Sequence, residues 1–448
     1  MNIASTISKL ISPTLFRLMG IDIFHYRKFL MDAATWTAQE RSAWRLERLG
    51  DIIEHCWNHV PFYHELWSDH GIKIRRPRSF DELELFPIIN RDMFREHRER
   101  IIAANINKIP YKTDSTGGTT GSPLKYYHDL SLHALRYGFV LIGLHFSGYN
   151  YGDEVCFIAG GSILPGKSSI RNRCRNWLER GHGISCVGMN INVAKGCHKM
   201  IERHQPLFLQ GYPSMIAEFC NIMNQENIPA YKSLKAVITT AEMLYPHYRK
   251  QIEDTLGVPV FDHYGCNDGG LLSYECERHN GFHYNDLESI ANVVAPDESG
   301  IGKLVITNLW NRSMPFIRYE NGDLVSLGQE PCRCGRIYPL IRNVIGRSGD
   351  ILRFSNGRTL GAPGLTLIFK ELPIEGWQVV QTGQDKLEVR IKAKQNLQID
   401  LEAYIRKIIC HHLESDIDIS IIYVTQLAVT KHGKLKPVFV EMADIKKD

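Results

Sequence analysis

The chain of 448 residues is 44% hydrophobic and 23% charged, which is typical of a globular protein with about two or three domains. Its 53 basic and 49 acidic residues leave a net charge of +4, which is too small to indicate a nucleic-acid partner. No apolar run approaches the roughly 18 residues of a transmembrane helix. Most of the eleven cysteines are isolated in apolar surroundings. They predict a reducing, cytoplasmic compartment and no disulfide scaffold.

Residues 1–20 form an amphipathic, mildly basic segment that lacks the compact apolar core and cleavage site of a secretory signal. They predict a first structural helix, with contact at a membrane surface as the alternative. Residues 36–110 predict helices interrupted by prolines. Within them, residues 38–60 have helical apolar spacing, and we expect Pro61 to end that helix.

From about residue 135 to 310, short apolar runs alternate with helical stretches. Buried strands are predicted at residues 154–161, 206–212, 234–242 and 258–265. Intervening helices are predicted at residues 213–225 and 245–256. This alternation predicts an α/β fold with an open, largely parallel sheet. Ligands of such sheets bind beyond the carboxyl ends of the strands.

The pattern changes near residue 350. A strand pair is predicted over 377–393, an amphipathic helix over 397–414, and two closing strands over 418–424 and 436–442. These elements predict a self-contained α+β unit of about a hundred residues. Residues 346–364 are rich in glycine, as in a hinge. We therefore expect a large N-terminal domain, residues 1–348, and a small C-terminal domain, residues 349–448.

Residues 114–125, DSTGGTTGSPLK, combine three glycines, five hydroxyl side chains and one lysine in a short stretch. Glycines let backbone N–H groups approach a partner closely, and with the hydroxyls and the cation they suit a phosphate chain. The stretch differs from a Walker A loop, because Gly121 is followed by Ser-Pro. Taken alone, it is also compatible with a flexible surface loop.

Four further motifs follow in the order HYGCNDGG (263–270), FIRYENGDL (316–324), RNVIGRSGD (342–350) and VTKHGKLK (429–436). Other matching stretches are HVPFYHELWSDHGI, LELFPIINRDMFREH, QGYPSMIAEF and ITTAEML. In this order the set resembles the adenylate-forming enzymes, and within them the branch of phenylacetate–coenzyme A ligase and the CapK-like proteins. The resemblance runs through nearly the whole chain. It implies a large N-terminal adenylation domain of mostly parallel sheets and helices, and a small α+β lid domain.

The resemblance implies a binding site for ATP. The glycine-rich loop would wrap the ATP phosphates through Ser115, Thr116, Gly117, Gly118, Thr119, Thr120, Gly121 and Lys125. Tyr264 would stack on the adenine, and Ala241 and Glu242 would line the same pocket.

The resemblance also implies a catalytic set of Lys434, Asp268 and Arg347. Asp268 stands where the family usually has a glutamate that helps to hold Mg²⁺, so its metal contact would run through water. Asp323 would accept hydrogen bonds from the ribose hydroxyls, and Arg347 would contact ribose or phosphate. Lys434 would reach the attacking carboxylate and the α-phosphate. Taken singly, Tyr264 could be core, Asp323 a turn former, and Arg347 and Lys434 surface charges.

Two cysteine-containing segments, ECERHNGFH and PCRCGR, suggest a zinc site. Zinc prefers four soft or borderline ligands in a tetrahedron, which two loops with closely spaced cysteine and histidine can supply. Some branches of the resembled family have a structural zinc with this pattern. We predict Cys276, His279, Cys332 and Cys334 as the ligands, with His283 as the substitute for His279. A chance pairing or a redox pair is the alternative.

The implied reaction uses ATP and Mg²⁺ to activate a small carboxylic acid as an acyl-adenylate, which is then transferred to coenzyme A. The lid would rotate about residues 349–350, although Gly349 stands where the family usually has an acid. An amide-forming ligase acting on an amino sugar or amino acid, in polysaccharide or secondary-metabolite biosynthesis, is the first alternative. A non-catalytic ATP-binding module is the second. The acyl pocket is expected in residues 135–165 and 210–245, and the sequence leaves a homodimer open.

Overall fold

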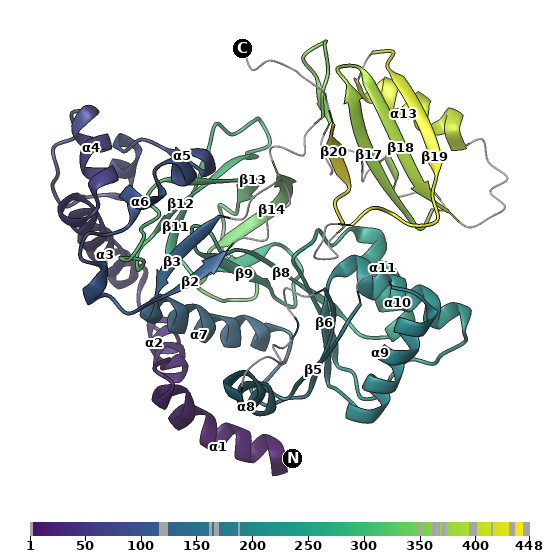
Figure 1. Ribbon diagram of the computed structural model, residues 1–448, viewed down its shortest axis with the longest axis horizontal. Helices are drawn as coiled ribbons and strands as arrows, with labels where there is room; N and C mark the ends of the chain where they lie inside the picture. Colours follow the sequence, from purple (N-terminus) through teal and green to yellow (C-terminus); the bar gives the residue numbers. More distant parts are fainter. Residues whose placement is uncertain are drawn as a thin grey trace.

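The computed structural model (Figure 1) describes most of the chain. The described residues are 3–115, 124–160, 164, 170–186, 189–347, 352–360, 365, 368–369, 372, 374–393, 401–413, 415–429 and 435–441.

The N-terminal quarter is helical, as predicted. Its four main helices are α1 (Ile3–Leu18), α2 (Ile23–Ala33), α3 (Ala38–His59) and α4 (Pro61–Asp69). The Thr37 side chain accepts from the backbone of Glu40, whose carboxylate accepts from the backbone of Thr37, so a capping box starts α3. As expected, α3 ends just before Pro61. Pro61 then occupies the first position of α4, where a missing N–H costs nothing.

Short elements lead from these helices to the central sheet. They are η1 (Phe80–Leu85), β1 (Ile89–Asn90), α5 (Arg91–Glu96), α6 (Arg98–Ile101), η2 (Ile106–Lys108), and the strands β2 (Tyr111–Ser115) and β3 (Lys125–Asp129). The last two form an antiparallel pair in which Ser115 lies opposite Lys125. The ends of the predicted phosphate loop are therefore held side by side.

One half of the central sheet is parallel, in the order β5-β4-β6-β7-β8. Its strands are β4 (Val155–Ala159), β5 (Gly181–Ser185), β6 (Phe208–Gly211), β7 (Ala236–Thr240) and β8 (Val260–Cys266). The accompanying helices are α7 (Leu130–Phe146), α8 (Ile170–Glu179), α9 (Ile191–His204), α10 (Pro213–Gln225) and α11 (Pro246–Leu256). This half confirms the predicted alternation of buried strands and helices.

The other half of the sheet is antiparallel and continues from β8 in the order β9-β10-β14-β13-β12-β11. These strands are β9 (Leu271–Glu275), β10 (Phe282–Tyr284), β11 (Ser289–Val294), β12 (Gly302–Asn308), β13 (Tyr319–Leu327) and β14 (Leu340–Arg347). The sequence did not predict this extension, because its strands are joined by turns and loops with no helical period between them.

From residue 352 on, the described chain forms separate sheets, as predicted for an α+β unit. A short pair, β15 (Leu352–Arg353) and β16 (Thr359–Leu360), precedes a sheet of order β19-β18-β17-β20. Its elements are β17 (Gly376–Gly383), β18 (Lys386–Lys392), α13 (Leu401–Leu413), β19 (Asp418–Tyr423) and β20 (Val438–Val440). This C-terminal unit lies beside α10 and α11 (Figure 1), where Lys392 Nζ is 2.9 Å from a carboxylate oxygen of Glu218. The predicted boundary at residues 348–349 lies outside the described residues.

Among the described helices, none is both long enough and apolar enough to cross a lipid bilayer.

A buried ion pair ties the N-terminal helices to the sheet. Arg41 of α3 contacts the Asp286 carboxylate through both Nε and Nη2, and Arg45 adds a longer contact at 3.5 Å. Arg41 and Asp286 are only 6% and 4% exposed, respectively. Removing one partner of such a pair leaves an uncompensated buried charge.

We therefore expect Arg41→Met to lower the free energy of unfolding by about 3 kcal/mol. The exposed pair of Lys28 and Asp32, 2.6 Å apart, provides the control. Lys28→Met should lower stability by less than about 1 kcal/mol, because water screens that pair. Urea denaturation of both variants would measure the difference, and equal losses would contradict this account of Arg41.

Candidate active site

The site begins where β7 and β8 end. These strands are parallel, and Thr240 pairs with His263, so the next residues, Ala241 and Tyr264, emerge at the same edge of the sheet. Ala241 has a φ of +70°, a left-handed conformation that turns the chain sharply after β7. Two of the three residues predicted to border the adenine therefore lie next to each other.

Asp323 is the centre of a buried hydrogen-bond cluster. Its Oδ2 accepts from the Tyr264 hydroxyl at 2.7 Å and from Asn321 Nδ2 at 2.8 Å, and Arg347 Nε lies 3.0 Å from Oδ1. Two features fix the local turn. Gly322 has a φ of +87°, and the Asp323 N–H donates a hydrogen bond to Asn321 Oδ1. Burial raises the pKa of Asp323 above its ordinary value, while Arg347 and the hydrogen bonds act in the opposite direction.

The register of β13 and β14 explains why Arg347 reaches this cluster. Asp323 and Arg347 are paired across the two strands, although 24 positions separate them in the sequence. Asp323 raises the pKa of the Arg347 guanidinium. The structure thus brings together Tyr264, Asp323 and Arg347, which were predicted from three separate motifs. Asn321 belongs to the same cluster and was missed, although the sequence Asn-Gly-Asp is a turn signal.

Asp268 lies in the loop after β8 and is buried, with the Tyr319 hydroxyl donating to its Oδ2 at 3.0 Å. A buried pair supports the same loop. Arg136 Nη2 donates to the carbonyl oxygen of Cys266 at 3.3 Å, and Arg136 Nε is 3.1 Å from Glu288. Burial raises the pKa of Glu288 to about 7, although Arg136 counteracts this effect. Arg136 and Glu288 were not predicted, since nothing in their flanking sequence relates them to the loop.

The position of the loop is also enforced by close packing at Gly270. A Cβ added there would lie 2.5 Å from Asn308 Nδ2 and 3.1 Å from a carboxylate oxygen of Glu288, and φ is +74°. A side chain at this position would displace the loop that carries Asp268.

Several predicted residues cannot be placed in this cluster. Thr116, Gly117, Gly118, Thr119, Thr120 and Gly121, and also Lys434, lie outside the described residues. Ser115 and Lys125 are both exposed, on the two strands that flank the predicted phosphate loop.

Glu242 joins the central sheet to the C-terminal unit. Its Oε2 accepts from the backbone N–H of Ser214 at 3.2 Å, and its Oε1 accepts from the backbone N–H of Leu435 at 2.6 Å. We expected Glu242 to line the adenine pocket, next to Ala241, but these contacts direct its carboxylate toward the C-terminal unit. A cavity of about 590 Å³ adjoins these contacts, between α10 and α11 on one side and the C-terminal unit on the other.

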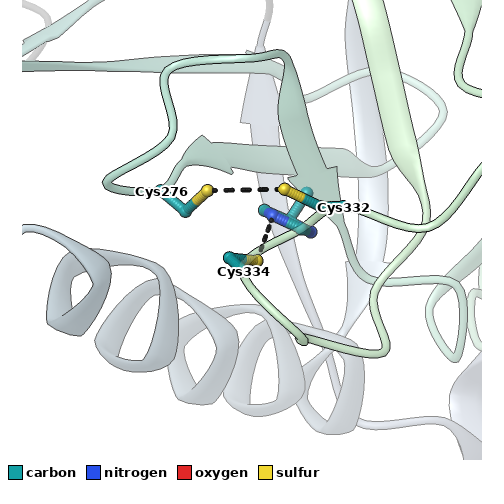
Figure 2. A group of neighbouring side chains, drawn as sticks. Cys276, Cys332 and Cys334 are labelled. Carbon is teal, nitrogen blue, oxygen red and sulfur yellow. Dashed lines mark hydrogen bonds between the residues drawn. The ribbon is translucent and has the colours of Figure 1, made fainter.

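A second cluster contains Cys276, His283, Cys332 and Cys334, whose ligand atoms all lie within 4.8 Å of one another. The sulfurs of Cys276 and Cys332 point toward each other, 3.8 Å apart (Figure 2), and the sulfur of Cys334 is 3.3 Å from His283 Nε2. His283 Nδ1 is 2.9 Å from the carbonyl oxygen of Tyr338, which leaves Nε2 for a metal. Zinc–sulfur bonds of about 2.3 Å in a tetrahedron separate two sulfurs by about 3.8 Å. The cluster therefore fits zinc.

His279, our first choice for the fourth ligand, does not belong to this cluster. Its Nδ1 lies 3.2 Å from a carboxylate oxygen of Glu275 and 3.3 Å from Arg249 Nη1. The turn after Cys276 places His279 at φ +47°, and its side chain is directed to the Glu275–Arg249 pair. The substitute, His283, takes the place beside the cysteines because β10 faces the loop of Cys332 and Cys334.

The sequence has curated relatives along most of its length. It is 26% identical over 327 residues to phenylacetate-coenzyme A ligase of Thermus thermophilus, covering 68% of this chain and 70% of the relative. It is 24% identical over 411 residues to the Pseudomonas putida enzyme of the same name, covering 88% and 90%. Protein CapK of Staphylococcus aureus is 23% identical over 317 residues, covering 68% of each chain. No family model matches the chain.

The chain is similar to the adenylate-forming enzymes. The resemblance to phenylacetate–coenzyme A ligase and the CapK-like proteins, which the motifs predicted, is confirmed by these curated relatives.

Solved structures of adenylate-forming enzymes share the fold of this one. The structure of 2-hydroxyisobutyryl-coenzyme A ligase in the postadenylation state, in complex with 2-HIB-AMP, matches with a TM-score of 0.73 and 19% identity, over 92% of this chain and 91% of that one. The same ligase in the thioesterification state, with 2-HIB-AMP and coenzyme A, matches with a TM-score of 0.57 and 20% identity, over 91% of both chains. The α/β fold with a C-terminal unit, predicted from the sequence, is confirmed.

Proposed function

We propose that this adenylate-forming enzyme couples ATP to a carboxylic acid, releases pyrophosphate, and transfers the acyl group from the adenylate to coenzyme A. The observation that carries the proposal is the cluster of Tyr264, Asp323 and Arg347, assembled from three strands beside Asp268. Curated relatives named phenylacetate-coenzyme A ligase support a carboxylic acid as the substrate and coenzyme A as the acyl acceptor.

The chemistry explains why these residue types are needed. A carboxylate resists nucleophiles because its leaving group would be oxide or hydroxide, and transfer to AMP supplies a phosphate leaving group. The enzyme needs no general base, since the attacking carboxylate is already an anion. It must hold that carboxylate in line with the α-phosphorus and offset the charge that develops on phosphate oxygens. Lys434 is the proposed cation at this centre.

The described residues fit the nucleotide part of this reaction. Asp323 would accept hydrogen bonds from the ribose hydroxyls, while Arg347, 39% exposed at its side chain, can contact ribose or phosphate. Tyr264 would stack on the adenine next to Ala241. Asp268, fixed by Tyr319, would hold Mg²⁺ through water because its side chain is short. Mg²⁺, when bound, offsets charge on the β- and γ-phosphates.

Lys434 provides the test of the chemical step. We expect Lys434→Ala to abolish carboxylic-acid-dependent ATP–pyrophosphate exchange, measured with phenylacetate and a panel of acids, and to leave ATP binding nearly intact. The lysine acts on the transition state more than on the bound ground state. Normal ATP–pyrophosphate exchange in this variant would show that another residue supports the chemical step. Absence of exchange with every acid in the wild-type protein, despite ATP binding, would favour the non-catalytic ATP-binding module.

Asp323 provides the test of the nucleotide site. We expect Asp323→Asn to raise the dissociation constant of ATP by about tenfold, because a charged acceptor of two hydroxyls is lost. The control is Asp254→Asn, at an exposed position on α11, which should leave the constant unchanged. Isothermal titration calorimetry would measure both, and thermal unfolding would detect a folding defect. Unchanged ATP affinity in a folded Asp323→Asn protein would place the ribose elsewhere.

The identity of the acyl acceptor distinguishes the proposed coenzyme A ligase from the amide-forming alternative. We expect coenzyme A to stimulate AMP release from the enzyme-bound adenylate, with a thioester as product. Stimulation by an amino sugar or amino acid, and none by coenzyme A, would instead identify an amide-forming ligase. The cytoplasmic location and a homodimer remain predictions.

We also propose that Cys276, His283, Cys332 and Cys334 bind a structural zinc ion. The near-tetrahedral separations of their ligand atoms and the backbone contact that orients His283 support this proposal. The site would connect the end of β9 and β10 with the loop between β13 and β14.

The zinc proposal predicts about one zinc per chain in the purified protein. We expect the pair Cys332→Ser and Cys334→Ser to lose both zinc and thermal stability, because structural zinc contributes folding free energy directly. His283→Ala should lose zinc, whereas His279→Ala should retain it. Cys410→Ser, at a cysteine outside the cluster, is the control. Elemental analysis and thermal unfolding would report both properties, and zinc-free native protein would refute the site.

A further inference from the structure

The Glu242 carboxylate bridges two parts of the chain that are far apart in sequence. One oxygen accepts from the Ser214 N–H, in the first turn of α10, where backbone N–H groups have no partner within the helix. The other oxygen accepts from the Leu435 N–H in the C-terminal unit. Hydrogen bonds from backbone N–H groups to a carboxylate are charge-assisted and therefore stronger than neutral ones.

The partner in the C-terminal unit lies next to the proposed catalytic lysine. The nitrogen of Leu435 belongs to the peptide group that directly follows Lys434. Leu435 is also held by a β-bridge to Val429 within its own unit. A hydrogen bond at this nitrogen therefore fixes the backbone one residue from the lysine side chain.

A second contact on α10 supports the same docking. Lys392 Nζ of β18 lies 2.9 Å from Glu218 and 3.4 Å from Glu375. Ser214 and Glu218 are four residues apart and thus lie on the same face of α10. Both contacts therefore connect this face to the C-terminal unit, and the Glu242 contact is adjacent to the lysine in the sequence.

The chain matches one state of the solved ligase better than another. The match to its postadenylation state has a TM-score of 0.73, against 0.57 for the thioesterification state, at nearly the same coverage. The chain as a whole is therefore more similar to the postadenylation state than to the thioesterification state. The Glu242 bridge is a contact of the arrangement in this structure.

We propose that Glu242 is a positioning residue that holds the C-terminal unit, and the peptide after Lys434, against α10 during adenylation. This inference rests on the proposed function. A contact made in one arrangement and broken in the other shifts their populations by its differential free energy. Glu242 should thus promote adenylation and oppose the departure of the C-terminal unit that acyl transfer requires.

The two half-reactions test this role separately. Glu242→Gln keeps one acceptor oxygen and Glu242→Ala keeps none. In ATP–pyrophosphate exchange with phenylacetate, we expect kcat to fall by about tenfold in Glu242→Gln and further in Glu242→Ala. The KM for ATP should change by less than about twofold. Transfer from synthetic phenylacetyl-adenylate to coenzyme A should be unchanged or faster in both variants.

Hydrogen–deuterium exchange supplies a readout that needs no substrate. The Leu435 amide should exchange faster in Glu242→Ala than in wild type, because its hydrogen-bond acceptor is lost. Amides of β17, which are held within the C-terminal sheet, should be unaffected. Glu226→Gln changes an exposed glutamate just after α10 and should match wild type in every assay.

The outcomes are distinguishable. If the hydrogen–deuterium exchange rate of the Leu435 amide is the same in Glu242→Ala as in wild type, the proposal is overturned, whatever the enzymatic activity. A rise in the KM for ATP with equal loss in both half-reactions would also overturn it, because Glu242 would then build the adenine pocket. If Leu435 exchanges faster but wild-type protein forms no adenylate with any acid, the docking contact stands and the proposed function fails.

Discussion

The change of direction at β8 determines where the site can form. On one side β8 pairs in parallel with β7, and on the other it pairs antiparallel with β9. The loop between β8 and β9 must reverse the chain at the carboxyl edge, where a parallel sheet presents its ligand-binding residues. Tyr264 lies on β8 just before this reversal, and Asp268 lies within it. The antiparallel half then carries Asp323 and Arg347 to the same edge.

Buried charges fix this arrangement because each needs its partner. A buried carboxylate without donors is costly, so Asp323 constrains Tyr264, Asn321 and Arg347 together. Arg136 and Glu288 act in the same way on the loop after β8. Such networks contribute little net stability, but they penalise alternative positions of the strands that they connect. The site thus acquires its geometry before a nucleotide binds.

The sequence predicted the parallel half well because continuous apolar strands and amphipathic helices have distinct periods. It missed the antiparallel half, whose pairing depends on register between distant segments. The motifs pointed to Tyr264, Asp323 and Arg347 as site residues, yet only the register of β13 with β14 makes Asp323 and Arg347 neighbours. Spacing alone could not choose between His279 and His283. A positive φ turns the first away, and a β-strand presents the second.

The cysteine cluster and the nucleotide cluster share two strands. Cys332 and Cys334 lie in the connection from β13 to β14, while Asp323, in the middle of β13, pairs with Arg347 at the end of β14. A constraint at the connection limits sliding of one strand past the other, and a slip by one residue would move Arg347 to the opposite face of the sheet. A metal held by these cysteines would therefore preserve the ion pair at the nucleotide site through register, without touching the nucleotide.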